Sequence, residues 1–185
     1  SASTETNKLV AAKRAKQQVR LRCKAIGADR MITLTYRENV LDKERIKRDF
    51  DSLRRLLGRI RNFQYVAVAE RQKRGAWHLH IAVKGRQNYR VLRGLWLRVV
   101  GEGNGNVDVR NPNREAHLRH KIACYIGKYI VKNFDEHQLN EKRYWASRGI
   151  KVPEVETIKH FLVDTPADAI VAAYEAVLET GATLV

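Results

Sequence analysis

Hydrophobic positions along the chain follow two different periods. Between residues 42 and 60 they recur at steps of four and three, which is the spacing of one face of an α-helix. Residues 31–36, 63–70 and 76–83 are short apolar runs with β-branched and aromatic side chains, which predicts strands. Only the basic segment 71–75 separates the last two runs, so we expect them to form an antiparallel hairpin.

The remaining segments complete the order of elements. Residues 8–24, rich in Lys, Arg, Ala and Gln, predict a basic helix that follows a polar lead-in. We also expect helices at 89–100, 114–133 and about 165–180, and strands at 107–109 and 143–152. The last helix begins with Thr165 as its cap and Pro166 at its first position. The fold class is therefore α+β, a central, mostly antiparallel sheet flanked by helices, in one domain over residues 1–185.

Charge narrows the partners. Lys and Arg total 36 against 20 Asp and Glu, a formal net charge of +16, which favours a polyanion such as nucleic acid. The two cysteines, Cys23 and Cys124, lack the spacing of a zinc finger and fit a reducing compartment. Neither a signal peptide nor an apolar run of membrane-spanning length is visible. We expect a cytoplasmic protein that has no contact with a membrane.

The strand at 76–83 carries two imidazoles on one face. Side chains alternate across a strand, so His78 and His80 lie together and Leu79 lies opposite. If Glu70 pairs near Ala76 in the hairpin, its carboxylate joins the same face. Two imidazoles and a carboxylate form a half-open site for Mg²⁺ or Mn²⁺, with positions left for water and a phosphate oxygen. The alternative is a polar sheet face that holds no metal.

The helix expected at 114–133 carries two phenols and two amines in one stripe. Tyr125, Lys128, Tyr129 and Lys132 occupy positions i, i+3, i+4 and i+7. A phenol with a pKa of about 10 is a weak nucleophile at neutral pH, so it needs a phosphate that a metal and nearby cations already polarise. Lys128 could supply that charge, or a proton to the leaving oxygen. The alternative is a structural tyrosine pair at the rim of a core.

Taken together, these segments resemble the HUH endonucleases, whose signature is His-hydrophobe-His. More narrowly, the chain is similar to the two-tyrosine rolling-circle replication initiators of bacteriophages. Their tyrosine helix has the pattern Tyr-x-x-Lys-Tyr-x-x-Lys, which residues 125–132 match. Their first motif is a strand like 32–35, and their second often joins a Glu, a basic turn with Gly and the two histidines, as residues 70–80 do. The resemblance covers roughly residues 31–132 and implies the nuclease fold of these initiators.

The resemblance implies a specific activity. His78, His80 and Glu70 hold a divalent ion on the scissile phosphate of single-stranded or hairpin origin DNA. One tyrosine attacks and keeps a 5′-phosphotyrosine link, and the other serves the second strand transfer; their order stays open. A conjugative relaxase or a transposase of the same superfamily is the alternative. The sequence has no Walker motif, so the chain is either the nuclease part of a longer protein or works with a host helicase.

Further residues have the chemistry of DNA contacts. Cations suit phosphates and rings suit bases. The expected contacts are Arg71, Lys73 and Arg74 in the turn, and Arg143, Tyr144, Trp145 and Arg148 near the end of the match. In the N-terminal helix we expect Arg14, Lys16, Arg20 and Arg22 to reach the backbone of the DNA. A basic nucleic-acid-binding domain without catalysis explains the charge equally well, but it leaves the three ordered motifs to chance.

Overall fold

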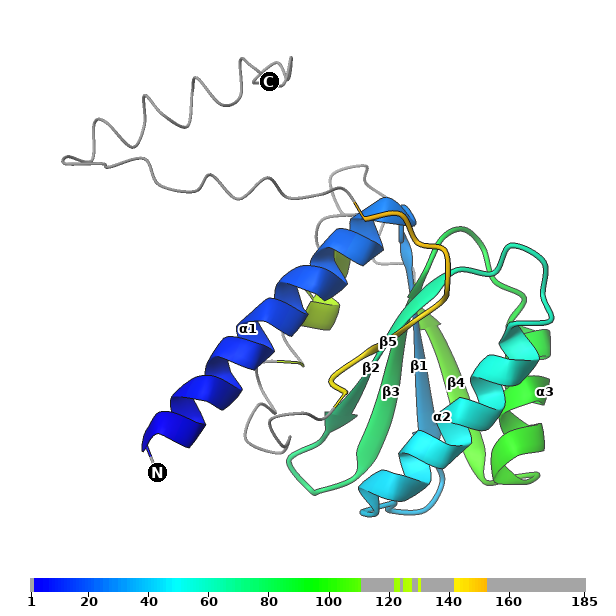
Figure 1. The fold of residues 1–185 in the computed structure, drawn as a ribbon. Coiled ribbons are helices and arrows are strands. Elements are labelled where there is room, and N and C mark those ends of the chain that lie inside the picture. Colours follow the sequence, from blue (N-terminus) through cyan, green and yellow to red (C-terminus); the bar gives the residue numbers. More distant parts are fainter. Residues whose placement is uncertain (1, 111–121, 124, 128–129, 131–141, 153–185) are drawn as a thin grey trace, which may run out of the picture. The chain divides into compact units, whose positions relative to one another are not determined.

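The computed structural model describes residues 2–110, 122–123, 125–127, 130 and 142–152, which belong to one compact unit, Ser1–Pro153. Five antiparallel strands form one sheet in the order β4-β1-β3-β2-β5. The strands are β1 (Arg30–Tyr36), β2 (Tyr65–Arg71), β3 (Trp77–Val83), β4 (Gly105–Arg110) and β5 (Trp145–Ala146), and the helices are α1 (Ala2–Ala25), α2 (Lys43–Leu57) and α3 (Tyr89–Val100). The α+β class with a helix-flanked antiparallel sheet is confirmed (Figure 1).

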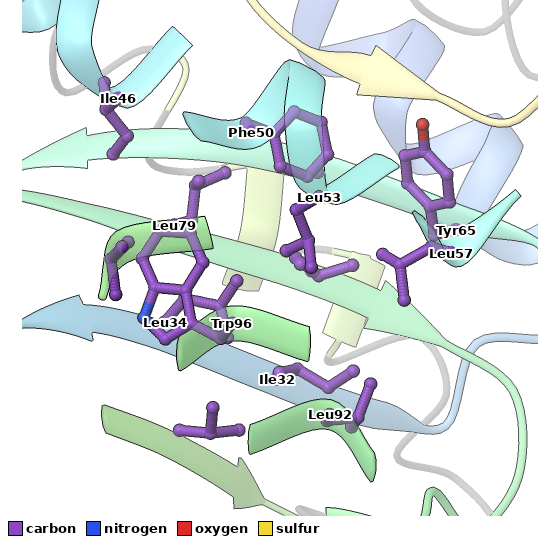
Figure 2. Packing of buried hydrophobic residues seen from close by; sticks show 14 of the residues in the cluster. Ile32, Leu34, Ile46, Phe50, Leu53, Leu57, Tyr65, Leu79, Leu92 and Trp96 are labelled. Carbon is purple, nitrogen blue, oxygen red and sulfur yellow. The ribbon is translucent and has the colours of Figure 1, made fainter. Parts of the chain in front are cut away.

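Helices α2 and α3 cover one face of the sheet, called here the α2 face (Figure 1). The side chain of Asp42 caps α2 by accepting a hydrogen bond from the backbone N–H of Glu44. The apolar stripe of α2 then packs on alternate residues of the central strands, as Figure 2 shows for Phe50 and Leu79. From α3, Trp96 is fully buried and donates its indole N–H to the carbonyl of Thr35. This face is a closed apolar core.

Helix α1 lies on the opposite face, called here the α1 face (Figure 1). Its contacts are small or medium in size, with Ala12, Val19 and Cys23 buried against Val66 and Ala82 of the sheet. The same cluster takes in four described helical residues from the segment that follows β4, namely Ile122, Ala123, Ile126 and Ile130. The segment expected to hold the tyrosines is therefore helical where it is described, and it packs on the α1 face.

The β2–β3 hairpin has the expected strands but a different register. Glu70 pairs with His78 rather than with Ala76, two residues further along β3. The turn is tighter than expected, because the backbone N–H of Gln72 already donates to the carbonyl of Ala76. Gly75 lies at φ 88°, in the left-handed region that glycine adopts without strain. A shift of two residues keeps the parity, so Glu70 and both histidines share the α1 face as expected.

Several expected boundaries were wrong. Helix α1 begins at Ala2, so the supposed polar lead-in is its first turn, and α2 ends at Leu57 rather than at residue 60. Strand β4 extends to Gly105–Arg110, whereas the strand expected at 143–152 is only Trp145–Ala146. Helix α3 has the expected bounds. The helix expected at 165–180 lies outside the described residues, and the single domain over the whole chain stays a prediction.

Candidate active site

A buried pair of polar side chains lies at the centre of the α1 face. Nε2 of His80 is 2.7 Å from Oε2 of Glu70, and the two residues are only 5% and 7% exposed. They come from adjacent strands, β3 and β2. A buried carboxylate is costly unless hydrogen bonds or a cation compensate it. The fold therefore holds a short, buried polar contact at the position where the sequence predicts metal ligands.

Two further side chains orient the imidazoles. Oγ1 of Thr33 lies 3.2 Å from Nδ1 of His80, because β1 pairs these two residues directly. The side-chain amide of Gln72 lies 2.8 Å from Nδ1 of His78. Each histidine is thus held through its Nδ1 edge, which is how proteins fix the ring of a metal-binding histidine. The sequence interpretation did not include Thr33 or Gln72 in the site.

Electrostatics keep His78 neutral. This residue is half-buried, and burial lowers the pKa of its imidazole from the ordinary value. The neighbouring His80 lowers the pKa further, against an opposing effect of Glu70. A neutral imidazole has a lone pair to offer, which is the form that binds metal ions.

Tyr125 lies against this pair. Its ring meets the ring of His80 edge-on, with centroids 6.5 Å apart and planes at 85°. The side chain is 41% exposed, unlike its helical neighbours Ile122 and Ile126, which are buried. Tyr125 therefore combines access from solvent with a position beside buried ligand-type groups. The other three predicted members of the stripe, Lys128, Tyr129 and Lys132, lie outside the described residues.

The donor set suits a divalent cation in chemistry, although the described residues hold no ready cluster. No group of three or more His, Cys, Asp or Glu among them is arranged to hold a metal ion. The closest contact is the 2.7 Å between His80 and Glu70. Neighbouring ligands of an octahedral Mg²⁺, each at about 2.1 Å, lie about 3 Å from each other. A small opening of this pair is enough, so the residue types present fit Mg²⁺ or Mn²⁺.

The register of the sheet adds one carboxylate that the sequence did not suggest. Thr33 pairs with His80 on one side and with Asp108 of β4 on the other. Residues opposite each other in an antiparallel pair share a face, so Asp108 lies in the same row. Its side chain is exposed, whereas His80 is buried. The α1 face thus carries a polar row across three strands.

The predicted DNA contacts divide into groups. Lys73 and Arg74 are exposed in the hairpin turn. Arg71 pairs with Trp77 and shares its face, which is the α2 face, so it lies opposite to the histidines.

The second group differs just as much along its length. Arg148 is exposed and Tyr144 is half-buried, but Arg143 is only 6% exposed. Trp145 is in the core, with its ring 4.9 Å from that of Phe50, and therefore presents no face to a base. In α1, Arg14 is exposed, and a larger part of Lys16, Arg20 and Arg22 is covered.

The fold and site define a class: a basic α+β domain with imidazole and carboxylate ligands on one sheet face and a tyrosine beside them. The family model of Replication-associated protein ORF2 matches residues 29–134, which is more than half of the chain. The chain belongs to this family, which is of the rolling-circle replication initiator type. Comparison with curated proteins and with solved structures gives no match.

The match covers β1 to β4 and extends over the whole segment that holds both tyrosines. It therefore assigns the chain a role in replication initiation, with DNA as its partner. The high positive charge agrees with such a partner. In the part of the chain that the structure describes, no helix has the length and apolar character needed to cross a membrane.

Proposed function

We propose that this protein is a site-specific, metal-dependent endonuclease and strand transferase for single-stranded DNA. It nicks origin DNA through a 5′-phosphotyrosine link, and the same chemistry begins and ends rolling-circle replication. One observation carries the proposal. The exposed phenol of Tyr125 lies beside the buried His80–Glu70 pair, with ring centroids of Tyr125 and His80 6.5 Å apart. A tyrosine that only filled the rim of a core would not need buried ligand-type groups beside it.

The ligands of the proposed ion are His78, His80 and Glu70. Mg²⁺ or Mn²⁺ bound there would polarise the scissile phosphate and offset its charge. The residues around the ligands keep them in place: the Thr33 hydroxyl holds Nδ1 of His80, and the Gln72 amide holds Nδ1 of His78. Burial of Glu70 and His80 excludes water from most of their surface, which strengthens every electrostatic interaction in the site.

In the proposed reaction, the phenol oxygen of Tyr125 attacks the phosphorus. A bond forms between this oxygen and phosphorus, and the bond from phosphorus to the 3′ oxygen breaks. The phenol proton passes to solvent, and the departing oxygen takes a proton, for which Lys128 is the candidate donor. The products are a free 3′-OH that primes synthesis and a 5′-phosphotyrosine. Tyr129 performs the same attack in the second transfer, supported by Lys132, or the two tyrosines act in the reverse order.

A covalent adduct tests the proposal. The full chain is incubated with Mn²⁺ and a 3′-labelled pool of single-stranded oligonucleotides that contain a degenerate central region. A labelled band at the mass of protein plus DNA should appear on a denaturing gel and should disappear with a chelator. Replacing both tyrosines (Tyr125→Phe with Tyr129→Phe) should abolish the band. Tyr89→Phe is the matched control, because Tyr89 is 43% exposed on α3 and Tyr125 is 41% exposed.

The same assay separates the rival functions. A chain that binds the pool strongly but never forms an adduct is a binding domain, and the catalytic proposal is then wrong. An adduct that survives the double Tyr→Phe change would exclude the tyrosines as nucleophiles. Formation of a closed single-stranded circle, resistant to exonuclease, supports an initiator over a relaxase, because only two successive transfers release a circle.

A further inference from the structure

A basic groove lies between α1 and residues 142–148, with a volume of about 490 Å³. We call it the α1–β5 groove. Its lining combines four cations, one aromatic ring and small residues that leave room for a ligand. The cations are Arg22, Lys142, Arg143 and Arg148. The ring is that of Tyr144, and Ala11 and Ala15 of α1 are among the small residues.

The charge of the groove is of one sign. No Asp or Glu is found among the described residues that line it. On α2, by contrast, cations are matched with carboxylates, as in the pairs Lys47–Glu44 and Arg54–Asp51. A concave surface whose charged residues are all cations concentrates the positive field and attracts an anion. The groove is therefore suited to phosphate groups, whereas the α2 surface has largely neutralised its own charge.

The groove is built, and its walls are tied together. Arg143 is only 6% exposed, and its Nη2 donates to the backbone carbonyl of Lys8, 3.5 Å away on α1. The guanidinium of Arg22 lies over the ring of Tyr144, with Cζ 5.5 Å from the centroid. Arg22 is itself held by the side chain of Gln18. These contacts place an aromatic ring and fixed cations side by side, which is how proteins grip a single strand.

The groove opens on the same sheet face as the candidate active site. Ala146 pairs with Val66, a member of the cluster under α1, so Tyr144 and Ala146 face α1 while Trp145 faces α2. Glu70 follows Val66 by four residues on β2. At about 3.3 Å per residue, the two positions are separated by about 13 Å along the strand. A DNA strand leaving the active site therefore needs only a short path to enter the groove.

We infer that the α1–β5 groove binds single-stranded DNA next to the cleaved phosphate, with one base on Tyr144 and neighbouring phosphates on Lys142 and Arg148. This inference rests on the proposed function, because it extends the substrate path of that site. The volume suits a ligand of one or a few nucleotides, since small-molecule pockets span about 300–1,000 Å³. Because it lies to one side of the histidines, the groove acts as an anchor and takes no part in the chemical step.

Charge removal tests the phosphate contacts. Binding of a fluorescent single-stranded pool to the full chain, without metal, is measured as a function of salt. The double variant Lys142→Gln with Arg148→Gln should reduce the slope of log K against log salt by about 1.4, because each lost phosphate contact accounts for about 0.7. The matched control removes two exposed cations near the end of α2, Arg55→Gln with Arg59→Gln, and should leave the slope unchanged. Equal changes in both pairs would overturn the inference.

The aromatic contact needs its own variants. Tyr144→Leu should weaken single-strand binding about 5- to 150-fold, the range expected when one stacked base is lost. Tyr144→Phe retains the ring and should bind within about twofold of the parent, which also controls for folding. Ultraviolet crosslinking of a strand that contains 5-iodouracil should label Tyr144, as located by mass spectrometry. Crosslinks confined to other residues would show that the groove is not the binding surface.

The outcomes distinguish the groove from the nuclease. If the adduct forms normally and the groove variants bind normally, the inference fails and the proposed function stands. If no adduct forms under any condition but the variants lose binding, the groove stands and the catalytic proposal fails. If the variants weaken binding to duplex DNA and leave single-strand binding unchanged, the groove takes a duplex, and the assignment of a single strand is wrong.

Discussion

The central strands present opposite chemistry on the two faces of the sheet. Toward α2, β1 and β3 present Leu34 and Leu79, which pack with Phe50 in a continuous apolar cluster (Figure 2). Toward α1, the same two strands present Thr33 and His80. Because neighbouring residues of a strand point to opposite faces, the α2 face can supply most of the stability while the α1 face holds a buried polar group.

The helices on the two faces differ in the same sense. Helix α1 contains seven Lys or Arg and one acidic residue, and α2 contains six and three. On α2, the described ion pairs include Arg45–Glu38, Lys47–Glu44, Arg48–Asp42 and Arg54–Asp51. Among the described residues, no ion pair joins α1 to a carboxylate. Charge is therefore left for a partner on the face that holds the candidate site.

The largest expected effect of a single substitution is on the α2 face. Phe50→Ala removes a fully buried ring that contacts Tyr65 and Trp145, and should lower the free energy of unfolding by about 3–5 kcal/mol. Denaturant unfolding measures the change. Val91→Ala, at a residue that is 47% exposed on α3, is the control and should stay within about 0.5 kcal/mol.

Adduct formation per folded molecule should remain unchanged in Phe50→Ala at a temperature where it is folded. A loss of adduct formation that exceeds the loss of folded protein would break the separation between the two faces.

The next effect belongs to the α1 face. Glu70→Gln keeps the shape of the side chain but removes the charge beside His80, so adduct formation should fall by about 10- to 100-fold. The titration of adduct yield against Mn²⁺ should shift to higher concentration, because a ligand has been weakened. Glu44→Gln, at an exposed position of α2, is the matched control and should change neither quantity.

A Glu70→Gln variant with normal adduct yield and normal Mn²⁺ dependence would contradict the assignment of this carboxylate as a ligand. The comparison of faces would then rest on Tyr125 and the histidines alone.

Parity explains why the sequence predicted so much of the site. The position of Glu70 beside His78 and His80 needs only the alternation of side chains and a hairpin, and an error of two residues in the register did not alter the face. Thr33 and Asp108 could not be found in this way. They join His80 because β1 lies between β3 and β4, and a strand order that combines distant segments does not follow from local patterns.

Other differences have local causes. The start of α1 was missed because its buried contacts are made by small residues such as Ala12, which do not produce a strong apolar stripe. Trp145 was placed at the DNA because it follows Arg143 and Tyr144 in a basic segment. In a strand of two residues the alternation is too short to be recognised, and it directs Trp145 into the α2 face.

Alkaline pH should reveal how tightly α1 is packed. Burial raises the pKa of the Cys23 thiol from 9.0 to about 12, so only the unfolded chain ionises between these values. The unfolded state then binds fewer protons than the folded state, and stability falls as pH rises. The contribution is fully present below pH 9 and should decrease by about 1.4 kcal/mol per pH unit above it. Denaturant unfolding at about pH 8 and about pH 10 measures the difference.

The control for this pH effect is Cys23→Ala, which should retain more of its stability at about pH 10 than the parent does. Equal losses in the two proteins would mean that Cys23 is already open to solvent in the folded state. Burial also raises the pKa of Tyr36 on the α2 face, so some loss with the same sign is expected in both proteins.

The smallest expected effect distinguishes a positioned histidine from a merely buried one. Thr33→Val keeps the volume and β-branching but removes the hydroxyl that lies 3.2 Å from Nδ1 of His80. The free energy of unfolding should fall by about 1 kcal/mol, the usual value of one hydrogen bond, and adduct yield should fall several-fold with a weaker dependence on Mn²⁺. Thr35→Val, on the same strand and the same face, is the matched control, because Thr35 pairs with Asn106 and not with a histidine. If both variants lose adduct yield equally, the hydroxyl of Thr33 has no special role in orienting His80; if only Thr33→Val does, the polar row on the α1 face supports the reaction as well as the fold.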